Sequence, residues 1–307
     1  MRDMKILIHI MNCIFSVMTC AIVMAIQEFC PEKDYSLKSY LLIAIFVITI
    51  GISCVILCLN IKNDKKLQQQ EKNERAGKVL SKITELAKFK SKLYSENTYE
   101  INFTKKELPY YYNVHRYLYD VCQNLKSTVA DIISTDESYI DVSLIYKYTD
   151  EDMWKWIAGK SGMSRAVNLN LFVNDRETLF NYVINNRKEM PIICNDKTKS
   201  KHYCSGSRDR VFDGQGSFYV MPIAFSNNEK GLVDSILMIS TYGVNFLPIK
   251  AKKKEINDFK RIIAHEIVRY YVEIIQSELG ALYVRHILKE KLKDKSNQKE
   301  FIKNIIK

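Results

Sequence analysis

The chain has 307 residues, of which 47% are hydrophobic and 26% are charged, so bulk disorder is excluded and one or two domains with real cores are expected. Its eight cysteines are scattered and do not form a disulfide framework, which favours reduced thiols in a cytosolic domain. The net charge of +11 lies in two segments, 60–92 and 285–307, and the rest is neutral overall. Basic segments outside the folded part indicate a lipid bilayer as partner, and no nucleic-acid polymer is expected.

Two apolar runs, about 6–27 and 39–59, are each long enough to cross a bilayer core of about 30 Å as a helix. The first run is too long for a cleaved signal peptide, and the second follows directly. Basic residues precede the first run and follow the second, whereas the connection between them is slightly acidic. The positive-inside rule therefore predicts a two-helix transmembrane hairpin over 1–60 in the cell membrane, with both termini cytoplasmic.

Residues 61–96 have the composition of a charged helical linker. Apolar residues recur at steps of three and four, which favours a coiled coil, although Lys90 interrupts the series; its members are Ala76, Val79, Ile83, Leu86 and Leu93. A solvated connecting rod fits the same pattern. Asn97 and Pro109 then mark a domain boundary.

Residues 112–278 alternate between helical and strand patterns. A helix is predicted over about 112–134, followed by a half-buried strand over 139–148 and further elements in the order strand 153–159, short helix 177–186, strand 190–194, polar loop, and a hairpin of strands 216–225 and 233–241. A long helix from about Glu255 carries two apolar rows, so we expect it to meet a second helix or subunit as well as the sheet. Residues 279–307 are expected to form a basic helical tail, and its end, SNQKEFIKNIIK, either rests on a bilayer or packs on its own domain.

The stretch NYVINNRKEMPIICND resembles the helix-to-strand segment of GAF domains, the small-ligand-sensing fold related to PAS. SFYVMPIAF followed by SILMIST is similar to the last hairpin of that family. The resemblance covers roughly 112–277 and implies an antiparallel sheet with the first and last helices on one face and a pocket on the other. It also implies that the segment between the third strand and the final hairpin covers the ligand. The family's cyclic-nucleotide signature and its bilin-attachment cysteine are not found.

The loop CNDKTKSKHYCSGSRDR, residues 194–210, occupies that covering position. It supplies donors for phosphate or carboxylate and acceptors for amines or ribose hydroxyls, on Asp196, Lys201, Arg208, Asp209 and Arg210. We expect Arg208 and Arg210 to help bind an anionic small molecule. Trp154 and Trp156 face one side of their strand and either line the pocket or fill the core. A plain solvated loop is the alternative.

Metal and catalytic sites are not recognisable. Cys194, His202 and Cys204 lack the paired knuckle and the fourth ligand of a zinc site, so neither a metal nor a cofactor is expected. In HEIVR, Arg269 stands where a metalloprotease helix needs its second histidine. An enzyme that uses Asp196, His202 or Asp209 is a rival hypothesis, but no nucleophile, base and orienting group can be recognised together.

These patterns predict an α+β protein in which a transmembrane hairpin and a helical linker precede a GAF-like antiparallel sheet flanked by N- and C-terminal helices. Its expected function is that of a membrane-anchored cytosolic sensor, not an enzyme. The sensor binds an anionic ligand, such as a nucleotide, and signals by rearranging helices in a homodimer or higher homo-oligomer toward the spans or a partner. Two alternatives are a nucleotide-activated antiphage effector that perturbs the membrane through its spans, and a GAF-like dimerisation scaffold without a ligand.

Overall fold

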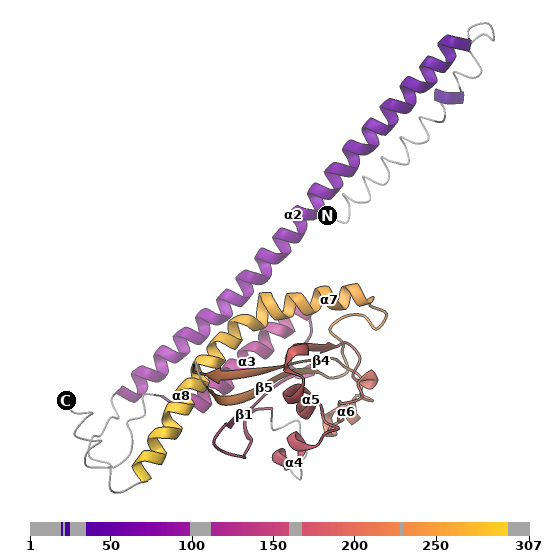
Figure 1. Cartoon of the computed structure of the whole chain (residues 1–307). Helices are drawn as coiled ribbons and strands as arrows, with labels where there is room; N and C mark the ends of the chain where they lie inside the picture. The colour runs from indigo at the N-terminus through magenta and orange to yellow at the C-terminus, as the bar shows by residue number, and fades with distance from the viewer. Residues whose placement is uncertain are drawn as a thin grey trace. The chain divides into compact units, whose positions relative to one another are not determined.

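The computed structural model describes Cys20 and residues 22–24, 35–98, 112–159, 168–227 and 230–293. The chain divides into two compact units, Met1–Asn73 and Glu74–Lys307. The second unit combines helices with an antiparallel sheet, which confirms the α+β class (Figure 1). It begins well before the predicted boundary at residue 112 because a long helix contributes its C-terminal part to the core.

Helix α2 runs without interruption over Tyr35–Thr98. The expected span ending near residue 59 and the helical linker over 61–96 both lie in this one continuous helix. No proline lies between Pro31 and Pro109, and the intervening sequence is rich in the helix formers Lys, Leu, Glu and Gln, so nothing stops the helix after the apolar run. The first predicted span lies outside the described residues, apart from Cys20 and residues 22–24.

One helix in the described part of the chain, within Val47–Ser95, is long and apolar enough to cross a membrane, judged by length and composition. Its apolar side chains are exposed, including Val47 at 61%, Val55 at 59% and Leu57 at 62%. A core helix of a soluble domain would bury such side chains. The described residues therefore contain one candidate membrane helix.

The centre of the second unit is a five-stranded antiparallel sheet in the order β2-β1-β5-β4-β3. The strands are β1 (Ile140–Tyr148), β2 (Lys155–Ala158), β3 (Ile192–Cys194), β4 (Phe218–Ser226) and β5 (Gly231–Thr241). All five predicted strands are present. The prediction that the first is half-buried was wrong, because β1 lies inside the sheet between β2 and β5 and both of its faces are covered.

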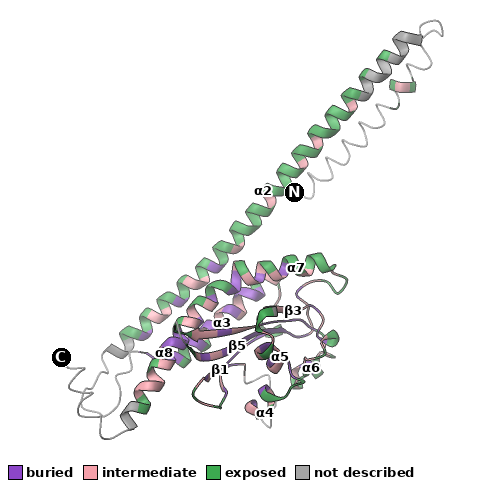
Figure 2. Ribbon diagram, viewed as in Figure 1, coloured by how far each residue is buried: buried purple, intermediate pink, exposed green. Residues whose placement is uncertain are grey.

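One face of the sheet packs against helix α3 (Val114–Ile133) and helix α8 (Arg269–Lys293), and the part of α2 that belongs to the second unit joins the same core. Helix α3 begins where the Asn113 side chain accepts a hydrogen bond from the Arg116 backbone N–H. Alternate β1 residues point to this face, namely Val142, Leu144 and Tyr146. Figure 2 shows the buried residues of α3 and α8 and the largely exposed surface of α2.

The apolar series on α2 packs into this core. Val79, Leu86 and Leu93 are only 2–3% exposed and contact the helices of the same chain. Lys90, which interrupted the series, forms an ion pair with Glu278 of α8. The expected coiled coil is therefore replaced by packing within the chain, since the side chains that would form its seam are already buried.

The closing helix has three parts, α7 (Lys253–Arg261), a π-helical segment (Ile262–Val268) and α8. Its buried residues recur every four positions: Phe259, Ile263, Ile267, Tyr271, Ile275 and Leu279. In a pure α-helix each step of four drifts by about 40° around the axis, whereas the wider π turns offset that drift. One buried stripe thus crosses both predicted apolar rows, and Tyr270 is left 46% exposed.

Helix α8 also extends the domain beyond residue 278. Leu279 and Leu282 are at most 2% exposed, and the Leu282 carbonyl accepts a hydrogen bond from the Tyr148 hydroxyl. Residues 279–293 are helical, as the tail was expected to be, and they continue the core helix α8. Residues 294–307 lie outside the described part.

Candidate ligand-binding cavity

The opposite face of the sheet borders a cavity of about 330 Å³. Helices α4 (Leu169–Asn174) and α5 (Leu179–Asn185) pack beside it, and α6 (Ser207–Val211) belongs to the segment that covers it. The floor comes from β1 and β5, where Asp141 pairs with Ser240 and Ser143 pairs with Met238. Since alternate residues of a strand share a face, these four side chains lie together.

The wall is mostly aromatic and apolar. It is formed by Trp156, Phe172, Leu179, Phe180, Tyr203 and Tyr242. The segment from Tyr203 to Arg210, between β3 and β4, supplies the cover together with its small residues Ser205, Gly206 and Ser207. Tyr203 stacks on Phe218 of β4, with ring centroids 5.4 Å apart, so the cover is fixed to the sheet. A mainly apolar wall with few polar groups is typical of small-molecule sites.

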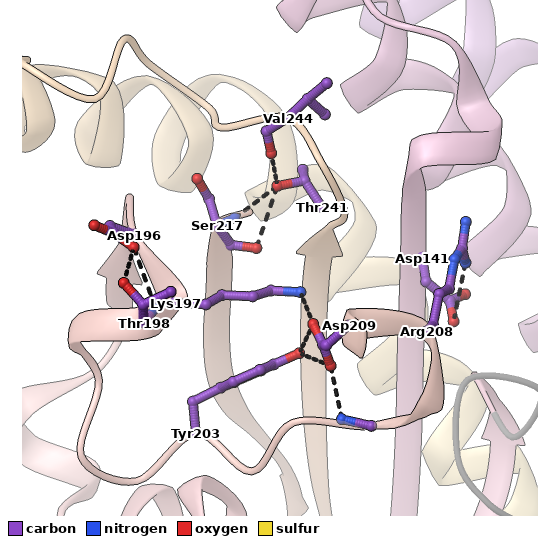
Figure 3. Close-up of polar contacts among 11 residues, drawn as sticks. Asp141, Asp196, Lys197, Thr198, Tyr203, Arg208, Asp209, Ser217, Thr241 and Val244 are labelled. Atoms are coloured by element: carbon purple, nitrogen blue, oxygen red, sulfur yellow. Dashed lines mark hydrogen bonds and ion pairs between the residues drawn. The ribbon is translucent and has the colours of Figure 1, made fainter. Parts of the chain in front are cut away.

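A buried ion pair holds the cover in place (Figure 3). The Lys197 ammonium lies 3.0 Å from an Asp209 carboxylate oxygen, and the two side chains are only 1% and 3% exposed. Asp209 also accepts hydrogen bonds from the Tyr203 hydroxyl at 3.0 Å and from the Gly206 N–H at 2.8 Å. Three donors satisfy this carboxylate, so Asp209 organises the cover rather than offering an open acceptor.

Lys197 lies in an aromatic cage. Its ammonium is 3.8 Å from the centroid of the Tyr242 ring and 4.8 Å from that of Tyr203. Burial lowers its pKa from 10.5 to about 8, although Asp209 acts in the opposite direction. The ring contacts and the ion pair compensate the desolvation of the charge only in part.

Asp141 and Arg208 form a second charged pair at the cavity. Asp141 is 8% exposed, and its carboxylate lies 4.0 Å from the Arg208 guanidinium, which also donates to the Ser138 carbonyl. Arg208 lies over the Tyr242 ring at 4.3 Å. Burial raises the pKa of Asp141, with the nearby Arg208 acting against that shift. Asp141 faces the cavity, whereas Arg208 does not line it and contacts Asp141 and the Tyr242 ring.

The predicted site residues separate into two groups. Trp156, Asp209 and Arg210 line the cavity, and the Arg210 guanidinium has no ion pair with a described residue. Trp154 is buried beside it and does not line it. The remaining three do not line the cavity: Arg208 packs over the Tyr242 ring, Asp196 caps the turn at Lys197–Lys199 and pairs with Lys199, and Lys201 is exposed.

The sequence interpretation missed Asp141, Ser143, Ser240, Tyr203 and Tyr242. A usable signal was present for the first three, because each is a polar residue in a mostly apolar strand. A strand covered on both faces has no solvent side for such residues, which places them at a cavity or a hydrogen bond.

In the part of the chain that the structure describes, no three His, Cys, Asp or Glu side chains are grouped as metal ligands. His202 stacks on Tyr182, with ring centroids 4.5 Å apart, and makes no hydrogen bond there with Asp196 or Asp209. The residues of the rival enzyme hypothesis are thus engaged separately. No protein-family model matches the chain, and no similar sequence was found among curated proteins.

Proposed function

We propose that the chain is a membrane-anchored sensor whose GAF-like cytosolic domain binds a small molecule in the cavity on the sheet. The cavity itself carries the proposal, because about 330 Å³ lies at the lower end of the range for ligand sites, which runs from about 300 to 1,000 Å³. The arrangement supports the GAF resemblance: helices α3 and α8 on one face, the cavity on the other, and the 203–210 segment as cover.

The ligand that fits best is an anion with a planar ring. Trp156, Phe172 and Phe180 offer aromatic surfaces to the ring, and Arg210 offers a guanidinium to a phosphate or carboxylate. Asp141 accepts from an amino group on the same ligand. A nucleotide combines these three features.

The anchor is a two-span hairpin with both termini in the cytoplasm. The apolar part of α2 supplies one span, and the apolar run at 6–27 supplies the other. Lysines that follow the apolar part of α2, at 62, 65 and 66, set this orientation.

Helix α2 is the output element. Arg75 pairs with Glu266 at 3.0 Å and Lys90 pairs with Glu278 at 2.5 Å, so two ion pairs join α2 to the closing helix. A ligand that shifts the sheet displaces α8 and with it α2, in a homodimer or higher homo-oligomer. The signal then reaches the spans or a partner protein.

The test uses the full chain purified in mild detergent. Native mass spectrometry and calorimetry with nucleoside mono- and triphosphates and with cyclic and linear dinucleotides should show one tight ligand. Trp156→Ala and Arg210→Ala should weaken it, whereas Lys201→Ala, a change of an exposed cation outside the cavity, should not. A chain that retains and binds no small anion contradicts the sensor and favours the scaffold.

A dye-leakage assay on vesicles that contain the full chain separates the two outputs. Leakage on addition of the ligand assigns the output to the spans, as expected for an effector that perturbs the membrane. Sealed vesicles at saturating ligand assign it to a partner protein.

A further inference from the structure

The chain presents an exposed basic surface where the connection after β5 enters α7. Residues 248–254, which we call the basic edge, contain four lysines and no acidic residue. Pro248, Ile249 and all four lysines are exposed, Ile249 at 68%. None of these lysines forms an ion pair with a residue that the structure describes. The edge therefore presents four exposed lysines beside an exposed apolar side chain.

The backbone beneath the basic edge is held rigidly. The Asn195 side chain, in a residue 8% exposed, donates to the carbonyls of Leu247 and Pro248 and accepts from the Leu247 N–H. The Ser217 hydroxyl, shown in Figure 3, accepts from the Phe246 N–H at 2.9 Å. On the other side, the Glu255 carboxylate accepts from the Lys252 N–H. The exposure of Ile249 is thus built into the fold.

The direction of the helices sets where the edge lies within the second unit. Arg75 pairs with Glu266 and Lys90 with Glu278, so this part of α2 and the closing helix run in the same direction (Figure 1). The basic edge precedes both glutamates along the closing helix. It therefore lies at the end of the unit that the chain enters at Glu74.

We propose that the basic edge binds anionic lipid headgroups and inserts Ile249 at the membrane interface. The proposal rests on the membrane anchoring stated above. An anionic leaflet attracts clustered lysines, and an apolar side chain flanked by lysines is typical of interfacial segments. Nucleic acid is a poorer match, because phosphate contacts leave the exposed isoleucine without a partner. The edge gives the sensor a second, peripheral contact with the bilayer.

Lysine acylation read by mass spectrometry tests the contact on the full chain. The chain is assembled into nanodiscs of phosphatidylcholine alone or with added phosphatidylglycerol. Lysines 250 and 252–254 should react about threefold or more slowly in the anionic nanodiscs, as each lysine gains from the surface potential. Lys201, exposed and outside the edge, is the internal reference. Equal rates in both nanodiscs overturn the proposal.

Variants separate this surface from the anchor. Lys250→Gln/Lys252→Gln/Lys253→Gln should abolish the protection of Lys254 while the protein still co-elutes with nanodiscs. Ile249→Asn should weaken the protection with the charge unchanged. If the chain assembles into neither nanodisc, the proposed membrane anchoring is wrong. Acylation of the same lysines with preformed anionic vesicles present then tests lipid binding by the basic edge independently of the anchor. Protection by duplex DNA but not by anionic lipid also overturns the proposal.

Discussion

The Lys90 ammonium nitrogen lies 2.5 Å from a carboxylate oxygen of Glu278, whose side chain is only 2% exposed. The Tyr112 hydroxyl donates to the other carboxylate oxygen. One buried carboxylate thus joins α2, which also carries the apolar segment, to the core helix α8. Such a pair fixes a specific arrangement more than it adds net stability, because desolvation offsets the attraction.

Removing one partner of this ion pair should lower the free energy of unfolding of the second unit. Lys90→Met leaves the buried Glu278 uncompensated and should lower the free energy of unfolding by about 2–4 kcal/mol. Lys90→Met/Glu278→Gln should recover most of the loss, since the glutamine still accepts from Tyr112. Urea unfolding in detergent, followed by tryptophan fluorescence, reports this unit alone because both tryptophans, Trp154 and Trp156, lie in it.

The matched control for this cycle is the Glu74–Lys78 pair on the same helix. Its side chains are 69% and 46% exposed, so Lys78→Met should change the unfolding free energy by about 0.5 kcal/mol or less. A loss at Lys78→Met as large as that at Lys90→Met would show that the effect comes from the helix and not from the buried pair.

The apolar series of α2 gives a second prediction. Leu86 is 3% exposed and part of the core, so Leu86→Ala should cost about 2–4 kcal/mol. Leu80, on the same helix and 67% exposed, is the control, and Leu80→Ala should cost about 0.5 kcal/mol or less. Measuring both variants at several protein concentrations separates intrachain packing from a coiled coil, whose stability rises with concentration. A concentration-dependent loss at Leu86 would restore the coiled-coil interpretation.

The same residues show what a sequence pattern can and cannot predict. Spacing identified Val79, Leu86 and Leu93 as one apolar stripe, and that was right. It did not say what the stripe covers, because a buried face has the same periodicity against another chain as against its own domain. Lys90 was the residue that did not fit a coiled-coil seam. Its partner Glu278 lies 188 positions away, so only the tertiary fold shows why a lysine stands there.

The cavity shows the same limit. All five strands were predicted from local apolar patterns and turn residues, but the pairing of Asp141 with Ser240 depends on strand register, which connects distant segments. Likewise, the charged loop was recognised as a candidate cover, yet nothing local distinguishes the buried Lys197 from the exposed Lys201. The difference comes from Tyr203 and Tyr242, which enclose one lysine and not the other.

Two cavity variants should separate recognition of the ligand's charge from recognition of its amino group. Arg210→Ala removes a guanidinium and should weaken an anionic ligand about 10- to 100-fold, the usual effect of losing a charge-assisted hydrogen bond. Asp141→Asn should weaken a ligand with an amino group and spare its analogue without one. Calorimetry with such analogue pairs is the measurement, and equal losses for both analogues would exclude Asp141 as the acceptor.

The buried Lys197 predicts a pH dependence of a defined sign. Its pKa is about 8 in the folded chain and 10.5 for an ordinary lysine, so between these values the unfolded chain binds more protons. The contribution of Lys197 to stability is therefore complete above pH 10.5 and is lost as the pH falls through 8.

Wild type should accordingly gain stability relative to Lys197→Met between pH 8 and 10, by up to about 1 kcal/mol per pH unit. The tyrosines that also titrate near this range are common to both proteins, so the difference between their unfolding free energies isolates the lysine. Lys197→Met/Asp209→Asn replaces the single variant if the unpaired aspartate prevents folding. A difference that is flat or falls with pH would mean that the ion pair with Asp209 outweighs desolvation, and that Lys197 is held as a fully charged group inside the cover.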